Sequence, residues 1–137
     1  MILLHSIRGG FIGALEDLAR TPTKDGTEVA LSIVGGAALQ MDTVNLDHLF
    51  RLAQEAVTNA LRHAEATLIQ VKLDIQAALV TLTVADDGIG LPFQPIVSDR
   101  LGLRLMRYRA DMIHAKLTIT RIEPHGTRII CECPQGN

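Results

Sequence analysis

Asp86 is the residue whose position in the sequence most strongly indicates chemistry. It ends a strand-like run, residues 79–86, in which valine and leucine alternate with threonine. Asp86 shares the parity of the apolar residues, and a carboxylate on the apolar face of a strand is costly unless hydrogen bonds satisfy it. Gly88 and Gly90 follow shortly after it and allow the backbone to turn sharply and approach a ligand. A carboxylate in an apolar pocket beside such a loop predicts a small-molecule site and favours a nucleotide.

Glu55 and Asn59 form a second candidate pair, because residues four apart on a helix are neighbours on one face. The amide oxygen of Asn59 could ligate Mg²⁺, which accepts carbonyl oxygens and keeps several waters. Glu55 could then orient or deprotonate a nucleophile. Arg62 lies near the apolar stripe of this helix, and His63 lies at its edge. A helix with such a polar face is more often simply a surface helix, so both interpretations stay open.

Thr127 and Gly102 could complete the site. Thr127 has the inward parity of its strand, so its hydroxyl is either an ordinary satisfied core group or the hydrogen-bond partner of Asp86. Gly102 lies at the start of an expected helix, where free N–H groups can hold phosphate. Three arginines lie near it in the sequence, and arginine suits phosphate geometry. They are Arg100, Arg104 and Arg107. For Arg107, a position on a solvated helix face is at least as good an explanation.

The elements that must position these residues follow from the apolar periodicity. The pattern predicts helices over residues 10–20, from a cap at Asp42 or Asn45 to about residue 63, and over residues 101–113. It predicts strands over residues 28–34, 68–75, 79–86, 116–122 and 127–133. On the last helix, one side carries Leu101, Leu105, Tyr108 and Met112.

In the predicted strands, apolar residues alternate with polar ones, so that one side of each strand is apolar and the other is polar. Most of the strands are linked by short hairpin connections. This pattern predicts a sheet with one packed and one wet face. The helices must then cover the packed face, which gives an α/β (α+β) two-layer sandwich. Residues 123–126 predict a turn, and His125 is expected to lie in that turn or to face solvent.

Composition narrows the class of protein. The chain has 137 residues, of which 47% are hydrophobic, so it can form one domain with a substantial core. A formal net charge of -2 gives no basis for nucleic-acid binding, which needs a basic surplus. No apolar run reaches membrane-spanning length, so no membrane contact is expected of this domain. Cys131 and Cys133 are expected to be reduced, small apolar strand residues.

Four segments, in this order, resemble the sequence boxes of the GHKL ATPase superfamily. The sequences of these segments are most similar to those of sensor histidine kinases of the nitrate-sensor and lipid-thermosensor type. The resemblance covers about residues 28–134. The segments are Glu55-Ala-Val-Thr-Asn59-Ala-Leu-Arg-His63-Ala for the N box, Asp86-Asp-Gly88-Ile-Gly90 for the G1 box, Leu101-Gly102-Leu103-Arg-Leu-Met-Arg-Tyr-Arg-Ala for the G2 region, and Gly126-Thr127 with Pro134 for the closing strand.

The resemblance implies a Bergerat ATP-binding fold, a mixed and mostly antiparallel sheet with helices on one face. It implies that Asp86 reads the exocyclic amine of adenine with the help of a water and Thr127. It also implies that Asn59 ligates a Mg²⁺ that bridges the ATP phosphates, with Glu55 near the γ-phosphate. The nucleotide-binding residues would be Asn59, Arg62, His63, Asp86, Gly88, Gly90, Gly102, Leu103 and Thr127, with Asn59 as the metal ligand and Glu55 as the catalytic residue.

The chain departs from the family pattern at two places. Arg100 stands where the G2 region often has its first glycine, and an arginine cannot take glycine-only backbone angles. His114-Ala115 stands where a Gly-Gly pair often follows the G2 helix. We also find no phospho-acceptor segment, because His5 is not followed by the expected acidic residue.

The resemblance therefore implies the catalytic ATP-binding domain of a two-component sensor histidine kinase. Residues 21–137 would form this domain, and residues 1–20 would be the tail of a preceding helical dimerisation region. It would bind Mg·ATP and pass the γ-phosphoryl group to a histidine on its dimerisation domain, with a response regulator as a further partner. The domain would be cytoplasmic and the parent protein could be anchored in the inner membrane.

Two other functions compete with this hypothesis. One is a non-catalytic nucleotide-binding or interaction module, which Arg100 and the missing acceptor favour. The other is an anti-sigma-type serine kinase, which shares the superfamily fold. A gyrase or chaperone ATPase fits less well, because a chain this short lacks transducer domains.

Overall fold

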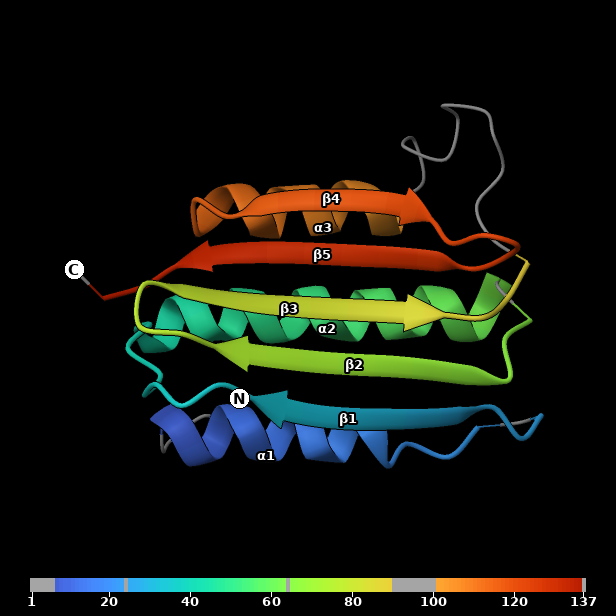
Figure 1. Cartoon of the computed structure of the whole chain (residues 1–137), viewed down its shortest axis with the longest axis horizontal. Coiled ribbons are helices and arrows are strands. Elements are labelled where there is room, and N and C mark those ends of the chain that lie inside the picture. Colours follow the sequence, from blue (N-terminus) through green and yellow to red (C-terminus); the bar gives the residue numbers. More distant parts are fainter. Residues whose placement is uncertain (1–6, 24, 64, 90–100, 137) are drawn as a thin grey trace.

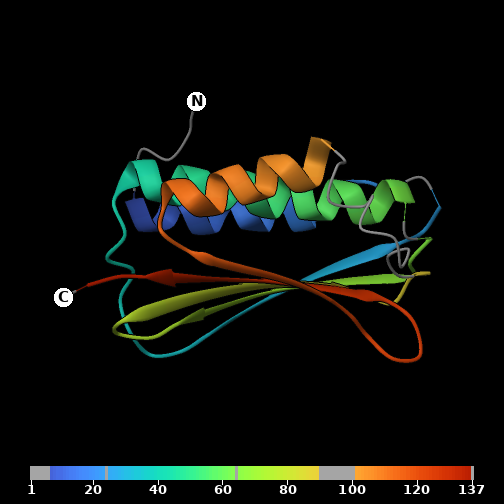
Figure 2. The ribbon, with the colours of Figure 1, turned by 90° about the horizontal axis from the view of Figure 1, so that it is seen from above.

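The computed structural model describes residues 7–23, 25–63, 65–89 and 101–136 (Figure 1). They form two layers, with a twisted sheet on one side and helices along one of its faces (Figure 2). This arrangement confirms the predicted two-layer sandwich. The helices are α1 (Ile7–Ala19), α2 (Thr43–His63) and α3 (Leu101–Met112), and the strands are β1 (Glu28–Val34), β2 (Leu68–Ile75), β3 (Leu79–Asp86), β4 (Lys116–Arg121) and β5 (Thr127–Pro134).

The sheet has the strand order β1-β2-β3-β5-β4. Only the β1–β2 pair is parallel among the described strands, and the other three pairs are antiparallel. A parallel pair needs a crossover connection, and α2 provides it. The mixed, mostly antiparallel sheet is therefore confirmed, and the hairpins β2–β3 and β4–β5 occur where short turns were expected.

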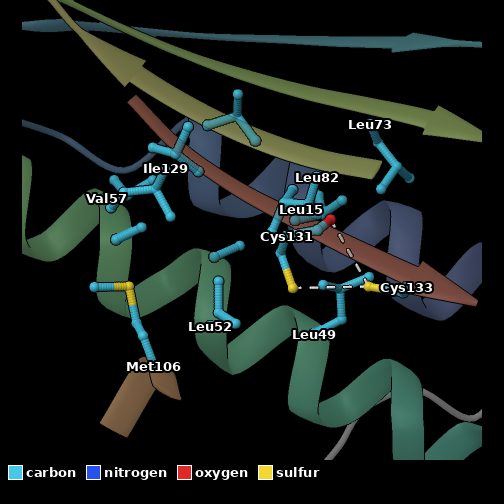
Figure 3. Close-up of a cluster of buried hydrophobic side chains, with 14 of the residues drawn as sticks. Leu15, Leu49, Leu52, Val57, Leu73, Leu82, Met106, Ile129, Cys131 and Cys133 are labelled. Carbon is cyan, nitrogen blue, oxygen red and sulfur yellow. Dashed lines mark hydrogen bonds between the residues drawn. The ribbon is translucent and has the colours of Figure 1, made fainter. Parts of the chain in front are cut away.

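Alternate residues of each central strand face the helices and form the core. In β3, the positions that share parity with Asp86 are all buried. Figure 3 shows how Leu49 and Leu52 of α2 approach Leu82 and Cys131 of the sheet. Burial of each such side chain contributes about 1.5–3 kcal/mol, so this interface supplies much of the driving force for folding.

The two cysteines behave as small apolar residues, as the sequence predicts. Cys131 and Cys133 are both fully buried and form no disulfide, and their sulfurs lie 3.8 Å apart (Figure 3). The hydrogen bond with Cys131, together with burial, raises the pKa of the Cys133 thiol well above its ordinary value. That thiol is therefore neutral and unreactive at physiological pH.

The start of α2 settles which residue caps it. The side chain of Asp42 accepts a hydrogen bond from the backbone N–H of Asn45 at 2.8 Å, which satisfies one of the free donors of the first turn. Asp42 is therefore the N-cap, and Asn45 lies inside the helix.

The side of α3 that packs is not the one that the sequence analysis singled out. Leu105, Tyr108 and Met112 are between 37% and 51% exposed. The side chain of Leu101 lies outside the described residues. The helix carries two apolar stripes of similar spacing, and contact with α2 and β4 selects the second one. The buried stripe consists of Leu103, Met106 and Ala110, and Ile113 continues it beyond the helix.

Helix α1 shares the core of the other elements. Phe11 and Leu15 are almost completely buried, and the helix packs against α2 and β1. Residues 7–19 thus contribute to the described fold. The assignment of residues 1–20 to a preceding region stays a prediction.

Gln135 ties the end of the chain to the loop before α2, a role that sequence reasoning missed. Its side-chain oxygen accepts from the Gln40 N–H at 2.7 Å, and its amide donates to the carbonyls of Ala38 and Gln76, both at 2.9 Å. These bonds satisfy a carboxamide that is 7% exposed.

His114 ends α3 in a conformation that favours glycine. Its φ is 56°, and the N–H groups of His114 and Ala115 bond back to the carbonyls of Asp111 and Ala110. This is a Schellman motif with histidine at the left-handed position, where a Cβ costs energy. The sequence analysis noted His114-Ala115 in place of a Gly-Gly pair, and the structure shows that His114 occupies the left-handed position there.

We expect His114→Gly to stabilise the chain by about 0.5–1 kcal/mol, because glycine adopts this φ without strain but loses more entropy on folding. Urea unfolding monitored by circular dichroism measures this effect. His114→Ala is the control, since it removes the imidazole but keeps the Cβ and should give no gain. Equal effects of the two variants would contradict the strain argument.

Candidate functional site

Asp86 lies at the end of β3, between β2 and β5, where it faces Ile69 on one side and Thr127 on the other. It is 9% exposed. The Gly88 N–H donates to its Oδ1 at 2.9 Å, and the backbone N–H of Thr127 also bonds to the carboxylate. Burial raises the pKa of Asp86, and these two hydrogen bonds counteract part of that shift. A costly carboxylate is therefore held in place with capacity to accept further hydrogen bonds.

Asp86 and Thr127 are cross-strand partners in the β3–β5 ladder, and both side chains are buried. The sequence analysis left open whether the Thr127 hydroxyl is an ordinary core group or a partner of Asp86. The contact with the carboxylate comes from the Thr127 backbone, and the role of the hydroxyl stays a prediction. The inward parity of Thr127 is confirmed, because its side chain is 6% exposed.

The turn between β4 and β5 lies in close contact with the backbone at the end of β3. A Cβ at Gly126, where φ is 122°, would lie 2.3 Å from the backbone oxygen of Asp86, so only glycine fits. Beside it, Nδ1 of His125 lies 3.0 Å from the carbonyl oxygen of Gly88. The sequence analysis left open whether His125 is bound in this turn or faces solvent, and its side chain is exposed. Its contact with Gly88 is a feature that the sequence did not reveal.

Asp87 faces the opposite way from Asp86 and has a structural role that sequence reasoning missed. Its exposed carboxylate accepts hydrogen bonds from the hydroxyl and N–H of Thr67 and from the N–H of Leu68. These bonds, led by that of the Thr67 hydroxyl, lower the pKa of Asp87. Strand parity could have separated the two aspartates, because neighbouring residues point to opposite faces. Asp87 thus anchors the loop after β3 to the start of β2.

Glu55 and Asn59 lie under the start of α3. A Cβ at Gly102 would come within 2.6 Å of the Glu55 carboxylate and 2.8 Å of the Asn59 amide. The predicted proximity of these three residues is therefore confirmed, and the absent side chain at Gly102 leaves room for the two polar groups. Both are half-buried instead of facing open solvent.

The remaining predicted residues divide into three groups. Arg62 is exposed at the end of α2, as are Arg104 and Arg107 on α3, where they remain available to a ligand. Leu103 is 5% exposed and packs in the core. The side chain of His63, and Gly90 and Arg100 entirely, lie outside the described residues.

Asp86 and the pair Glu55 and Asn59 belong to elements that meet at the same end of the molecule. In Figure 1 the end of β3, the C-terminal part of α2 and the beginning of α3 all lie at that end. A small cavity of about 140 Å³ borders Glu55 and is also lined by Arg51, Gln54, Leu105 and Arg109. It does not include Asp86, and it is smaller than the ~300–1,000 Å³ typical of ligand pockets, so it is not an adenine pocket.

No helix in the described part of the chain is long and apolar enough to cross a bilayer. Among the same residues, no group of three or more histidine, cysteine, aspartate or glutamate side chains could hold a metal ion. A cation near Asn59 would thus need most of its ligands from a bound molecule and water.

The chain resembles known proteins over most of its length. It is 39% identical over 88 residues to the sensor protein VraS of Staphylococcus haemolyticus, which covers 64% of this chain and 25% of that protein. It is 36% identical over 83 residues to the nitrate/nitrite sensor protein NarX of Escherichia coli, which covers 61% of this chain and 14% of that protein. The chain thus spans a quarter or less of these relatives.

Solved structures share the fold. The ATP-binding domain of PrrB from Mycobacterium tuberculosis superposes with a TM-score of 0.71 at 23% identity, covering 96% of this chain and 95% of that one. Residues 44–137 match the family described as histidine kinase-, DNA gyrase B- and HSP90-like ATPase. Because this match covers more than half of the chain and contains every predicted site residue, the chain belongs to that ATPase family and is homologous to the ATP-binding domains of sensor histidine kinases.

Proposed function

We propose that this chain binds Mg·ATP and supplies the γ-phosphoryl group for phosphorylation of a histidine on a separate dimerisation domain. The observation that carries the proposal is Asp86, a buried carboxylate held by one N–H donor from the loop after β3 and one from the first residue of β5. A fold does not require such a group, and its burial costs free energy. A ligand donor that completes its hydrogen bonds would offset that cost.

The arrangement around Asp86 suits adenine better than guanine. The exocyclic amine of adenine is a donor and complements a carboxylate, whereas guanine presents an acceptor oxygen at the equivalent position. The N–H groups of Gly88 and Thr127 already donate to the carboxylate of Asp86. Only its remaining lone pairs can accept a hydrogen bond from a ligand, and these two bonds fix the direction in which they point. Asp86 therefore orients the base and excludes acceptors.

Asn59, Glu55 and the first turn of α3 would serve the phosphate end. The space above Asn59 and Glu55 is kept open by the missing side chain of Gly102. The free N–H groups of the α3 start favour an anion, and Arg104 lies within this first part of the helix. Asn59 would contribute an amide oxygen to Mg²⁺, which would neutralise phosphate charge when bound.

In the transfer, the bond between the γ-phosphorus and the bridging oxygen breaks while a bond to the acceptor imidazole nitrogen forms, and ADP leaves. Positioning and charge stabilisation supply most of the catalysis in such reactions. Glu55 could accept the imidazole proton or orient the acceptor. The acceptor domain, a response regulator and a membrane-anchored parent protein with this domain in the cytoplasm belong to the same proposal.

Asp86→Asn should weaken ADP binding about 10- to 100-fold, measured by isothermal titration calorimetry. The amide has one acceptor oxygen where the carboxylate has two, so its NH₂ must oppose at least one of three donors, the Gly88 N–H, the Thr127 N–H or the adenine amine. Asp74→Asn is the matched control, because it makes the same change on β2 outside the site. Unchanged affinity in Asp86→Asn would remove Asp86 from the site.

The same variant should reveal the cost of burying Asp86. Because its pKa is raised on folding, the wild type is most stable relative to Asp86→Asn at pH values below the ordinary carboxyl pKa. That relative stability should fall as the pH rises through the folded-state pKa and then level off. Urea unfolding of both proteins between pH 3 and 7 measures it, and parallel curves or a rising difference would contradict the assignment.

In the protein that joins this chain to its dimerisation domain, incubation with γ-labelled Mg·ATP should produce acid-labile label, as phosphohistidine does. Asn59→Ala should reduce labelling at least tenfold through loss of a metal ligand. Gln54→Ala, which removes an exposed amide from the same helix, should retain it. Acid-stable label would favour the serine kinase, and ATP binding without any label would favour the non-catalytic module.

A further inference from the structure

His125 makes a side-chain contact that the sequence analysis did not predict. It lies in the turn between β4 and β5, with its side chain exposed, and its Nδ1 lies 3.0 Å from the carbonyl oxygen of Gly88. The two residues are 37 positions apart in the chain. The contact therefore links two separate turns at the edge of the candidate site.

Gly88 is held from both sides. Its N–H donates to Oδ1 of Asp86 at 2.9 Å, and its carbonyl lies against His125. A glycine has many accessible conformations, so a residue that anchors its carbonyl also restricts the direction of its N–H. The orientation of the Asp86 carboxylate depends on that N–H.

The neighbouring residues leave little freedom for the turn that carries His125. Gly126 contacts the Asp86 backbone closely, and the Gly126 carbonyl accepts from the Ile122 N–H at 3.0 Å. Thr127 is paired with Asp86 in the β3–β5 ladder. The position of this turn is thus fixed, and the contact of His125 with Gly88 links the loop that follows β3 to it.

We infer that His125 is a positioning residue for purine recognition, which acts by fixing Gly88 and thereby the acceptor direction of Asp86. This inference rests on the proposed function. His125 must carry a proton on Nδ1 to donate to the Gly88 carbonyl, a condition that both the imidazolium and one neutral tautomer meet. The side-chain amide nitrogen of an asparagine can occupy nearly the same place as Nδ1.

The experiment compares ADP and GDP binding to the whole chain by isothermal titration calorimetry. His125→Ala should weaken ADP binding about three- to tenfold and should weaken GDP binding less, so that the preference for ADP shrinks. His125→Asn should restore most of both the affinity and the preference. Glu123→Ala is the matched control in the same turn, and it should match the wild type.

Three results would overturn the inference. The first is an unchanged ADP preference in His125→Ala, and the second is an equal loss for both nucleotides that His125→Asn does not restore, which would indicate a general structural effect. These two results would contradict only the inference. The third is a wild-type chain that binds neither nucleotide, which would contradict the proposed function itself and the inference with it.

Discussion

The carboxylate of Asp86 lies at the end of β3 on the apolar face of the sheet, where it needs hydrogen-bond donors. The rest of the site depends on this constraint. Burial favours the protonated form of Asp86, and the N–H groups of Gly88 and Thr127 offset part of that effect. One donor comes from the loop after β3, and the other from the first residue of β5. Satisfying one side chain therefore requires two turns, distant in sequence, to meet.

Two glycines make the close approaches that this arrangement needs. Gly126 allows the β4–β5 turn to touch the backbone of Asp86, and Gly102 allows α3 to begin directly over Asn59 and Glu55. In each case a Cβ would stand less than 3 Å from a polar atom of the site. The glycines thus act through the space they leave. The end of β3, which carries Asp86, and the C-terminal half of α2, which carries Glu55 and Asn59, lie at the same end of the fold (Figure 1).

The sequence was sufficient to predict what depends on local pattern. Strand parity predicted the burial of Asp86 and Thr127, and helical spacing predicted the proximity of Glu55 and Asn59. Periodicity could not choose between the two apolar stripes of α3, because contact with α2 and β4 makes that choice. The His125–Gly88 contact was equally out of reach, since it joins residues that only the folded sheet brings together.

Under the proposed function, the Asp86 carboxylate, held by the amides of Gly88 and Thr127, receives adenine. Amide NMR spectroscopy of the ¹⁵N-labelled chain, titrated with Mg·ADP and separately with inorganic pyrophosphate, tests this role. We expect Mg·ADP to shift the Gly88 and Thr127 amide signals strongly, and we expect pyrophosphate to leave them unchanged and to shift the Gly102 signal. Gly88 and Thr127 signals that stay in place when Mg·ADP binds would show that adenine does not reach Asp86.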